Sequence, residues 1–320
     1  MSDQLLDQKW CLRNWPNEAH YLMDFFLKRT NTSVKTRFRS SLNMSMLMAQ
    51  SPSNPRLIIV SNRLPVTVKS SQDGAFEYST STGGLVSGLN GISYKMSSQW
   101  YGWPGIDITE GERNNVKETL WRGYRAVPVW ISEDLADSHY NGFSSANPIA
   151  PYGWLASDGC WSIIDTVLWP LLHYHSAEFF FDEGHWKSYR DVNNIFAQVL
   201  AQELRDGDII WIHDYHLMLL PNLLRAEAAK RGKHIKIGYF LHTPFPSSQI
   251  YSILPVRKEI LLGVLGSDLV AFHTYDYAKH FLRSCSKILW VCDLTCLHLE
   301  YLFLQLFWDY TFTDRETPHG

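Results

Sequence analysis

The chain has 320 residues and a net charge of −3, and 45% of its residues are hydrophobic and 19% charged. This composition predicts a folded globular protein with a large core and excludes a disordered chain. Because 29 basic residues are balanced by 32 acidic ones, there is no cationic field of the kind that binds nucleic acid or a membrane surface.

Residues 1–55 show no clear hydrophobic period and lack acidic residues after Asp24, while Lys and Arg residues cluster there. We expect a disordered basic extension. The acid-free part resembles a transit peptide, but it does not stand at the terminus, where Asp3 and Asp7 lie.

The first predicted strand is Leu57–Val60, a short apolar run that is typical of a parallel strand buried on both faces. Four further runs follow: Ala126–Ile131, Asp208–Ile212, Ile235–Leu241 and Asp268–Phe272. Between the later runs lie two segments with helical periodicity: Glu183–Arg205, and Leu217–Lys230, which stops at Gly232. Strands that alternate with helices predict an α/β fold with a doubly wound, Rossmann-like parallel sheet.

Ligands of such sheets bind at the carboxyl ends of the strands. Arg63 follows the first strand, and Gly83 and Gly84 open a later segment, where free N–H groups could attract a phosphate. The two glycines match neither the dinucleotide fingerprint nor the P-loop, and they are also compatible with an ordinary turn.

Two histidine-containing motifs follow later strands: His213-Asp214-Tyr215-His216, and His242 within His-Thr-Pro-Phe-Pro. Three interpretations are open: sugar binding, satisfied core histidines, and a metal site that adds His273. The histidine spacing is not that of a zinc site, and sugar binding is favoured.

Aromatic residues are abundant, and most should be core. One or two could line a pocket, because aromatic faces stack on sugar rings. The candidates are Trp100, Tyr101, Trp103, Trp130, Tyr140 and Trp169.

The five cysteines are an odd number without a repeated spacing, which predicts reduced thiols. Cys292 and Cys296 with His298 lack the second ligand pair of a zinc site. The chain also lacks an apolar signal core and a run long enough to span a membrane. We expect a soluble, cytoplasmic protein.

Seven motifs occur in one fixed order between Arg56 and Leu289, and together they resemble the trehalose-6-phosphate synthase family. They are Val60–Pro65, Ser81–Leu85, Trp100–Gly105, Tyr140–Ser144, Val167–Pro170, Trp211–His216 and Phe240–Pro246. The resemblance implies a retaining glycosyltransferase of GT-B architecture, with two Rossmann-like domains. It also implies transfer of glucose from UDP-glucose to glucose 6-phosphate, without a metal or cofactor.

The same resemblance implies roles for single residues. The phosphate of glucose 6-phosphate would be held by Arg63, Tyr140 and Trp169. Trp103 and Asp214 would position the acceptor sugar. Gly83, Gly84 and His242 would contact the donor UDP-glucose, with His242 and Asp214 closest to the reaction.

The chain departs from the family pattern in two places. A segment at about 146–165 appears inserted between Tyr140 and Trp169, and residues 290–320 form an unrelated tail. We therefore expect one N-terminal glycosyltransferase domain at 56–289, with the second domain largely missing. Such a truncated chain should be inactive alone.

The partners implied are the two substrates, and other trehalose synthase or phosphatase subunits. The alternatives are a non-catalytic acceptor-binding or regulatory module of a synthase complex, and a metal-dependent hydrolase that uses His213, Asp214, His216 and His242.

Overall fold

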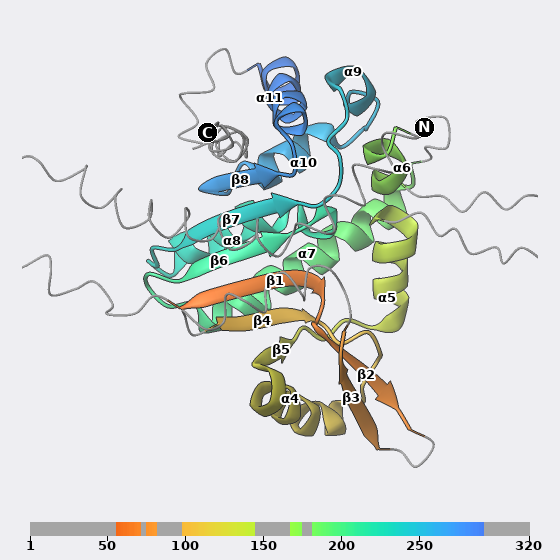
Figure 1. Cartoon of the computed structure of the whole chain (residues 1–320), viewed down its shortest axis with the longest axis vertical. Helices are drawn as coiled ribbons and strands as arrows, with labels where there is room; N and C mark the ends of the chain where they lie inside the picture. Colours follow the sequence, from red (N-terminus) through yellow and green to blue (C-terminus); the bar gives the residue numbers. More distant parts are fainter. Residues whose placement is uncertain (1–55, 72–74, 82–97, 145–166, 175–180, 291–320) are drawn as a thin grey trace, which may run out of the picture. The chain divides into compact units, whose positions relative to one another are not determined.

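A computed structural model describes residues 56–71, 75–81, 98–144, 167–174 and 181–290 (Figure 1). The predicted extension at 1–55, Gly83 and Gly84, the segment at 146–165 and the tail after Trp290 lie outside the described residues. Within the described ranges, no helix combines the length and the apolar character needed to cross a bilayer.

A six-stranded sheet organises the described residues, with strand order β5-β4-β1-β6-β7-β8. The strands are β1 (Leu57–Arg63), β4 (Ser98–Trp103), β5 (Ala126–Pro128), β6 (Ile209–His213), β7 (Lys236–Leu241) and β8 (Leu269–Phe272). Counted along the chain, these six strands lie in the order 3-2-1-4-5-6, which is the order of a doubly wound dinucleotide-binding sheet. The predicted α/β fold class is confirmed.

Strand β1 lies in the middle of the sheet and pairs in parallel with β4 and with β6. Its apolar run from Leu57 to Val60 is at most 4% exposed, as expected of a strand covered on both faces. Leu57 lies opposite Ser98 of β4 and Ile209 of β6. The order in which the chain adds strands reverses between β1 and β6, and ligands of doubly wound sheets bind at this switch point.

Two parts of the structure were missed by the sequence analysis. Strand β4 was not predicted because Gln99 and Gly102 interrupt its apolar pattern. Gln99 is nevertheless buried, since its Oε1 accepts a hydrogen bond of 3.1 Å from Arg56. After the first strand, where no further strand was predicted before Ala126, the chain forms an antiparallel hairpin of β2 (Val66–Ser70) and β3 (Phe76–Thr80).

Helices connect the strands, and two of them match the predictions with shifted ends. Helix α7 covers Glu183–Glu203, and α8 covers Leu220–Lys230. Helix α8 begins three residues later than predicted because Tyr215–Leu217 form a separate 3₁₀ turn, η3. It ends before Gly232, whose φ of 61° favours glycine, as predicted.

The remaining helices are α4 (Glu110–Tyr124), α5 (Glu133–Asp137), the π-helix η1 (Ser138–Ser144), α6 (Leu168–Leu172), α9 (Ser248–Tyr251), α10 (Arg257–Val264) and α11 (Tyr275–Leu289). The predicted strand Ala126–Ile131 is shortened to the three residues of β5, which ends at Pro128. Proline has no N–H with which to extend a ladder.

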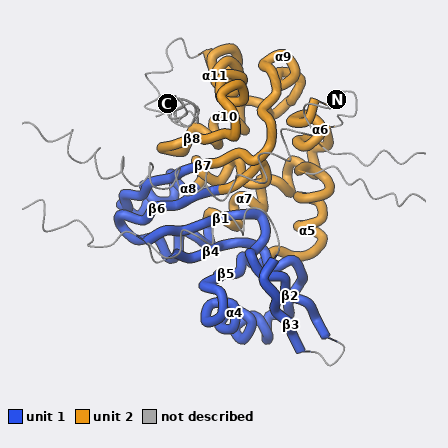
Figure 2. The backbone as a smooth tube through the Cα atoms, in the orientation of Figure 1, with its two compact units in different colours: residues 1–130, 198–212, 224–238 blue, residues 131–197, 213–223, 239–320 orange. Residues whose placement is uncertain are grey.

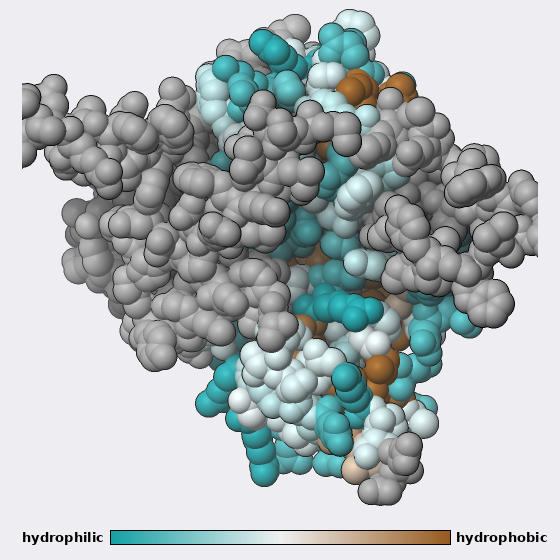
Figure 3. Space-filling view, turned by 45° about the vertical axis from the view of Figure 1, so that its right-hand side comes forward, coloured by the Kyte–Doolittle hydropathy of each residue, from teal (hydrophilic) through white to brown (hydrophobic). Residues whose placement is uncertain are grey.

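The chain divides into two compact units (Figure 2). Unit 1 comprises 1–130, 198–212 and 224–238, and it contains β1 to β5 and α4. Unit 2 comprises 131–197, 213–223 and 239–320, and it contains η1, α6, η3, β8 and the helices α9 to α11. On the face shown in Figure 3, the described surface is mostly hydrophilic, and its apolar residues form small separate groups.

Candidate active site

Polar residues stand at the carboxyl ends of the central strands. Arg63 is the last residue of β1, His213 is the last residue of β6, and His242 directly follows β7. These are the positions at which a doubly wound sheet presents side chains to a ligand. The strand-end residues predicted from sequence are therefore at strand ends in the structure.

In unit 1, Arg63 and Trp103 lie together. The guanidinium carbon of Arg63 is 5.0 Å from the centre of the Trp103 ring, a cation–π contact. The Arg63 side chain is exposed and makes no hydrogen bond or ion pair with another described residue. The guanidinium carries five N–H donors, which suit a bound anion.

Trp103 is 7% exposed, and its buried Nε1 has no hydrogen-bond partner among the described residues. A buried indole N–H normally finds an acceptor. Arg63 and Trp103 together present a planar cation and an indole N–H donor, and both groups suit a phosphate or a sugar hydroxyl as ligand.

In unit 2, Asp214 has an unusual backbone conformation, with φ 72° and ψ 169°. Residues other than glycine rarely adopt this region, and it costs roughly 1–3 kcal/mol. The conformation is fixed by neighbouring groups: the Asp214 N–H donates to the Phe240 carbonyl at 2.8 Å, and the Asp214 carbonyl accepts the Tyr239 hydroxyl at 3.0 Å. Strain that is held in place in this way is common at functional sites.

The Asp214 carboxylate faces the end of β7. Its Oδ1 accepts the backbone N–H of His242 at 3.3 Å, and its Oδ2 lies 3.9 Å from Nδ1 of His216. Burial raises the pKa of Asp214 to about 6, although the N–H groups of Tyr215 and His242 oppose that shift. The side chain keeps 24% exposure, so a ligand can reach it.

His213 and His242 form a pair, with 3.0 Å between Nδ1 of His213 and Nε2 of His242. Burial lowers the pKa of His213 to about 3, and burial together with the neighbouring histidines lowers the pKa of His242. Both rings are neutral at pH 7. A neutral pair can share one hydrogen bond and present a donor or an acceptor, but it carries no positive charge.

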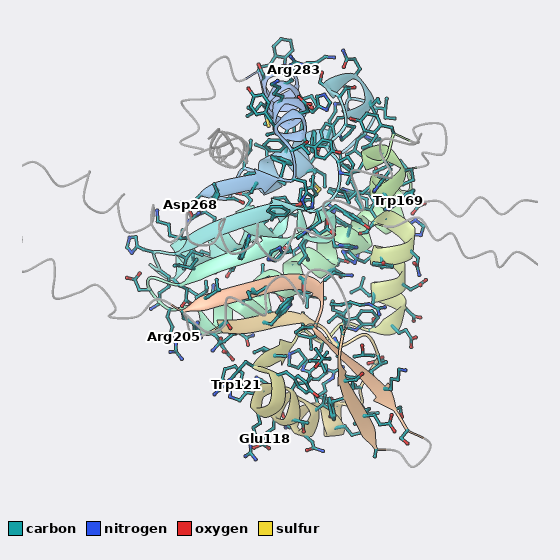
Figure 4. All side chains as sticks on the ribbon, in the orientation of Figure 1. Glu118, Trp121, Trp169, Arg205, Asp268 and Arg283 are labelled. Atoms are coloured by element: carbon teal, nitrogen blue, oxygen red, sulfur yellow. The ribbon has the colours of Figure 1, made fainter. Side chains whose placement is uncertain are left out.

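Tyr140 and Trp169, the predicted phosphate ligands of unit 2, stack on different histidines. The Tyr140 ring lies parallel to that of His216, with 5.3 Å between their centres. Trp169, on α6 (Figure 4), stacks on His173 at 4.1 Å. Helix α6 packs against η1, the helix that carries Tyr140.

The metal interpretation has no support in the described part of the chain. There, no group of three or more His, Cys, Asp or Glu side chains is placed to hold an ion. The alternative set of Cys292, Cys296 and His298 lies outside the described residues, as do Gly83 and Gly84.

Residues 55–300 match the model of glycosyltransferase family 20. The chain belongs to this family. Curated relatives are synthases of fungi. The chain is 54% identical over 234 residues to alpha,alpha-trehalose-phosphate synthase [UDP-forming] 1 of Aspergillus niger, an alignment that covers 73% of this chain and 41% of the relative. It is 49% identical over 243 residues to the enzyme of Schizosaccharomyces pombe, covering 76% and 44%.

Solved structures of this family share the fold. An alpha,alpha-trehalose-phosphate synthase (UDP-forming) from Burkholderia vietnamiensis superposes with a TM-score of 0.53 at 26% identity, covering 73% of this chain and 42% of that one. The trehalose-6-phosphate synthase OtsA superposes with a TM-score of 0.52 at 31% identity, covering 73% and 44%. The family 20 chain described here thus spans less than half the length of the relatives it matches.

Sequence reasoning missed three buried polar residues of this family 20 chain: His139, Tyr189 and Asn193. Tyr189 lies in the segment Glu183–Arg205 that was predicted to be helical, but no hydrogen-bonding role was predicted for it. The signal for Asn193 is its position four residues after Tyr189 on the buried face of α7, where a polar side chain needs hydrogen-bond partners.

Proposed function

We propose that this chain is the acceptor-binding part of a UDP-forming trehalose-6-phosphate synthase, a retaining transferase that moves glucose from UDP-glucose to glucose 6-phosphate. The observation that carries the proposal is the 54% identity over 234 residues with the Aspergillus niger enzyme of that name. The GT-B architecture is part of the proposal, with the described sheet as its N-terminal Rossmann-like domain.

The solved relatives indicate the substrates. The Burkholderia xenovorans synthase, 28% identical, was solved in complex with glucose 6-phosphate. The Escherichia coli enzyme, 29% identical, was solved with UDP-2-fluoro glucose. Both ligands carry phosphate, which suits the guanidinium of Arg63.

For the acceptor, we assign phosphate binding to Arg63, Tyr140 and Trp169. A guanidinium, a phenol O–H and an indole N–H are all donors, and the phosphate oxygens are acceptors. Trp103 is assigned to the sugar, which is supported by its Nε1, a donor with no hydrogen-bond partner among the described residues. Asp214 is assigned to the sugar hydroxyls, because above a pKa of about 6 its carboxylate accepts hydrogen bonds.

For the donor, the assigned residues are Gly83, Gly84 and His242. The glycines would present backbone N–H groups to the diphosphate and stabilise the leaving group as its negative charge develops. His242 would contact the donor glucose as a neutral ring, which avoids a positive charge beside a sugar carbon that itself becomes positive. The reaction then depends on positioning and electrostatics, because the acceptor hydroxyl attacks on the face from which UDP departs.

The place of action and the partners follow from this function. We assign a cytoplasmic location. Further synthase or phosphatase subunits are proposed partners.

The proposal is tested by glucose 6-phosphate binding to the chain, measured by calorimetry. Arg63→Ala is expected to weaken binding by roughly 10- to 100-fold, because a charge-assisted contact to phosphate is lost. Arg113→Ala is the matched control, since Arg113 also lies over a tryptophan in unit 1, at 5.5 Å from the Trp130 ring. Equal affinity of the Arg63 and Arg113 variants would contradict the assignment.

Turnover is measured separately, as UDP released from UDP-glucose in the presence of glucose 6-phosphate. UDP release that depends on the acceptor supports the transferase. Acceptor binding without UDP release matches the expectation of an inactive chain, whereas a folded chain that neither binds glucose 6-phosphate nor releases UDP would contradict the proposed function.

A further inference from the structure

Side chains from two other helices satisfy the backbone of the turn at residues 215–219, which directly follows Asp214. The Tyr189 hydroxyl donates to the Tyr215 carbonyl at 2.7 Å and accepts the Met218 N–H at 3.0 Å. The Asn193 amide donates to the His216 carbonyl and accepts the Leu219 N–H, each at 3.2 Å. Nε2 of His139 donates to the same His216 carbonyl at 3.0 Å.

These three side chains are fully buried. Tyr189 and Asn193 are 0% exposed and His139 is 1% exposed. Tyr189 and Asn193 each bridge two separate backbone groups of the turn, so one substitution leaves two buried groups unsatisfied. Such a loss costs more than the bond itself contributes, because no water replaces the missing partner.

The protonation of His139 follows from its partner. A carbonyl oxygen only accepts, so Nε2 must carry the hydrogen. Burial lowers the pKa of His139 to about 4, which keeps the ring neutral at pH 7. Its ring also stacks on Tyr189, with 5.4 Å between the ring centres. The donor at His139 is therefore fixed in tautomer and in orientation.

The turn is linked to two of the predicted ligands of unit 2, Asp214 and Tyr140. The Leu217 N–H donates to the Asp214 carbonyl at 3.3 Å, which joins the turn to the strained residue. The Tyr140 ring stacks on His216. The His216 carbonyl accepts the hydrogen bonds from the His139 ring and the Asn193 amide. Tyr140 is also the chain neighbour of His139 on η1.

We infer that His139, Tyr189 and Asn193 are positioning residues, which hold the turn at 215–219 so that the Asp214 carboxylate and the Tyr140 ring keep a fixed relative placement. The inference deepens the proposed function and rests on it for the identity of the ligand. It predicts that loosening the turn weakens acceptor binding although none of the three residues contacts the acceptor.

The test compares Tyr189→Phe with Tyr251→Phe. Tyr251 is equally buried, and its hydroxyl donates to the Arg257 carbonyl at 3.2 Å, away from the turn. Both variants lose a buried phenol hydroxyl, and thermal unfolding measures the general cost. Tyr189→Phe is expected to weaken glucose 6-phosphate binding by roughly tenfold, whereas Tyr251→Phe leaves it within twofold of the parent chain.

A second readout needs no ligand. The titration of Asp214 is followed by NMR of chains labelled at the aspartate carboxyl carbon, with Asp214→Asn for assignment. The groups that face Asp214 are His216 from η3, His242 and Tyr239 from the β7 end, His273 after β8, and Tyr189 from α7. In Tyr189→Phe, water reaches the loosened turn, and the midpoint is expected to move from about 6 toward 3.8.

Two substitutions of His139 separate a positioning role from a general effect on stability. His139→Gln keeps an N–H donor near the place of Nε2 and is expected to preserve the Asp214 midpoint, whereas His139→Leu removes the donor and shifts the midpoint downward. If Tyr189→Phe and His139→Leu leave the midpoint where it is in the parent chain, the inference is wrong. If the midpoint shifts but no variant or parent binds glucose 6-phosphate, the positioning role stands and the proposed function fails.

Discussion

Among the residues that the structure describes, Asp214 combines a strained backbone with a reactive side chain. Its φ of 72° and ψ of 169° suit glycine, and yet a carboxylate stands there. Glycine would give the same backbone path without strain, so the path alone does not explain an aspartate. The side chain does explain it, because its Oδ1 accepts the His242 backbone N–H and its Oδ2 lies 3.9 Å from Nδ1 of His216, while part of the group stays accessible.

Substitution at this residue should separate stability from binding. Asp214→Gly is expected to be more stable than Asp214→Ala by about 1 kcal/mol, because alanine has a Cβ in a region that glycine enters freely. Both variants are expected to lose acceptor binding. Urea unfolding measures the stability, and calorimetry with glucose 6-phosphate measures the binding.

The control for this comparison is Lys187, which is exposed in the regular helix α7. In a regular helix alanine is favoured over glycine, so Lys187→Gly should be less stable than Lys187→Ala by about 1 kcal/mol. Finding alanine favoured at both positions would refute the strained conformation of Asp214.

Among the elements, β4 packs so closely against the end of β1 that only glycine fits between them. A Cβ on Gly102 would lie 2.7 Å from the carbonyl carbon of Arg63 and 2.7 Å from the N atom of Leu64. The β1–β4 register shifts between Val60 and Arg63, at this same place. Gly102 therefore sets how closely the β1 backbone at Arg63 approaches β4.

Replacing Gly102 by alanine should affect both the sheet and the ligand. We expect Gly102→Ala to destabilise the chain by about 1–3 kcal/mol through overpacking against backbone, and to weaken glucose 6-phosphate binding by displacing Arg63. Chemical unfolding and calorimetry report the two effects.

Helix α4 supplies the matched substitution. Gly123 has nothing within 4 Å of an added Cβ, so Gly123→Ala should raise the free energy of unfolding by about 0.5–1 kcal/mol. A Gly102→Ala chain as stable as the parent would contradict the close approach of the two strands.

At the scale of the whole molecule, buried histidines make stability depend on pH. The pKa of His139 is lowered to about 4 and that of His213 to about 3, from 6.5. Below pH 6.5 the unfolded chain takes up protons that the folded chain refuses, so the free energy of unfolding falls. Asp214 acts oppositely between pH 6 and 3.8, because its raised pKa lets the folded chain bind a proton first.

The histidines outnumber the aspartate and their pKa values are shifted further, so we expect a net loss of stability from pH 7 to pH 5. In His139→Gln, the free energy of unfolding should depend less steeply on pH. The slope should fall by up to about 1.4 kcal/mol per pH unit, which is the limit for one proton. Urea unfolding at a series of pH values measures this. A His139→Gln chain whose free energy of unfolding keeps the pH slope of the parent chain would contradict this prediction.

Sequence patterns predicted strands whose residues are uniformly apolar and failed where polar residues or glycine interrupt a buried strand. Leu57–Val60 is apolar on both faces and was found, whereas β4 contains Gln99 and Gly102 and was not. The missing information is tertiary: Gln99 is tolerated because Arg56 binds it. The strand-end rule likewise predicted where Asp214 and His242 stand.

The arrangement around those residues could not be predicted. Nothing in the letters His-Asp-Tyr-His indicates a positive φ, which is imposed by partners on β7 and η3. The network of His139, Tyr189 and Asn193 joins two helices to one turn, and only the fold shows which polar side chains meet. A polar residue on a buried helical face, as at Asn193, is the one local sign.

The central position of β1 has a consequence during synthesis on the ribosome. Arg56 and Asp208, which form a buried ion pair at the start of β1, are separated by 152 residues. At 5–20 residues per second, roughly 8–30 s pass between the emergence of β1 and that of β6. Throughout this interval one edge of an apolar strand lacks its β6 partner and can pair with other chains. The nascent chain is thus a natural client of ribosome-associated chaperones.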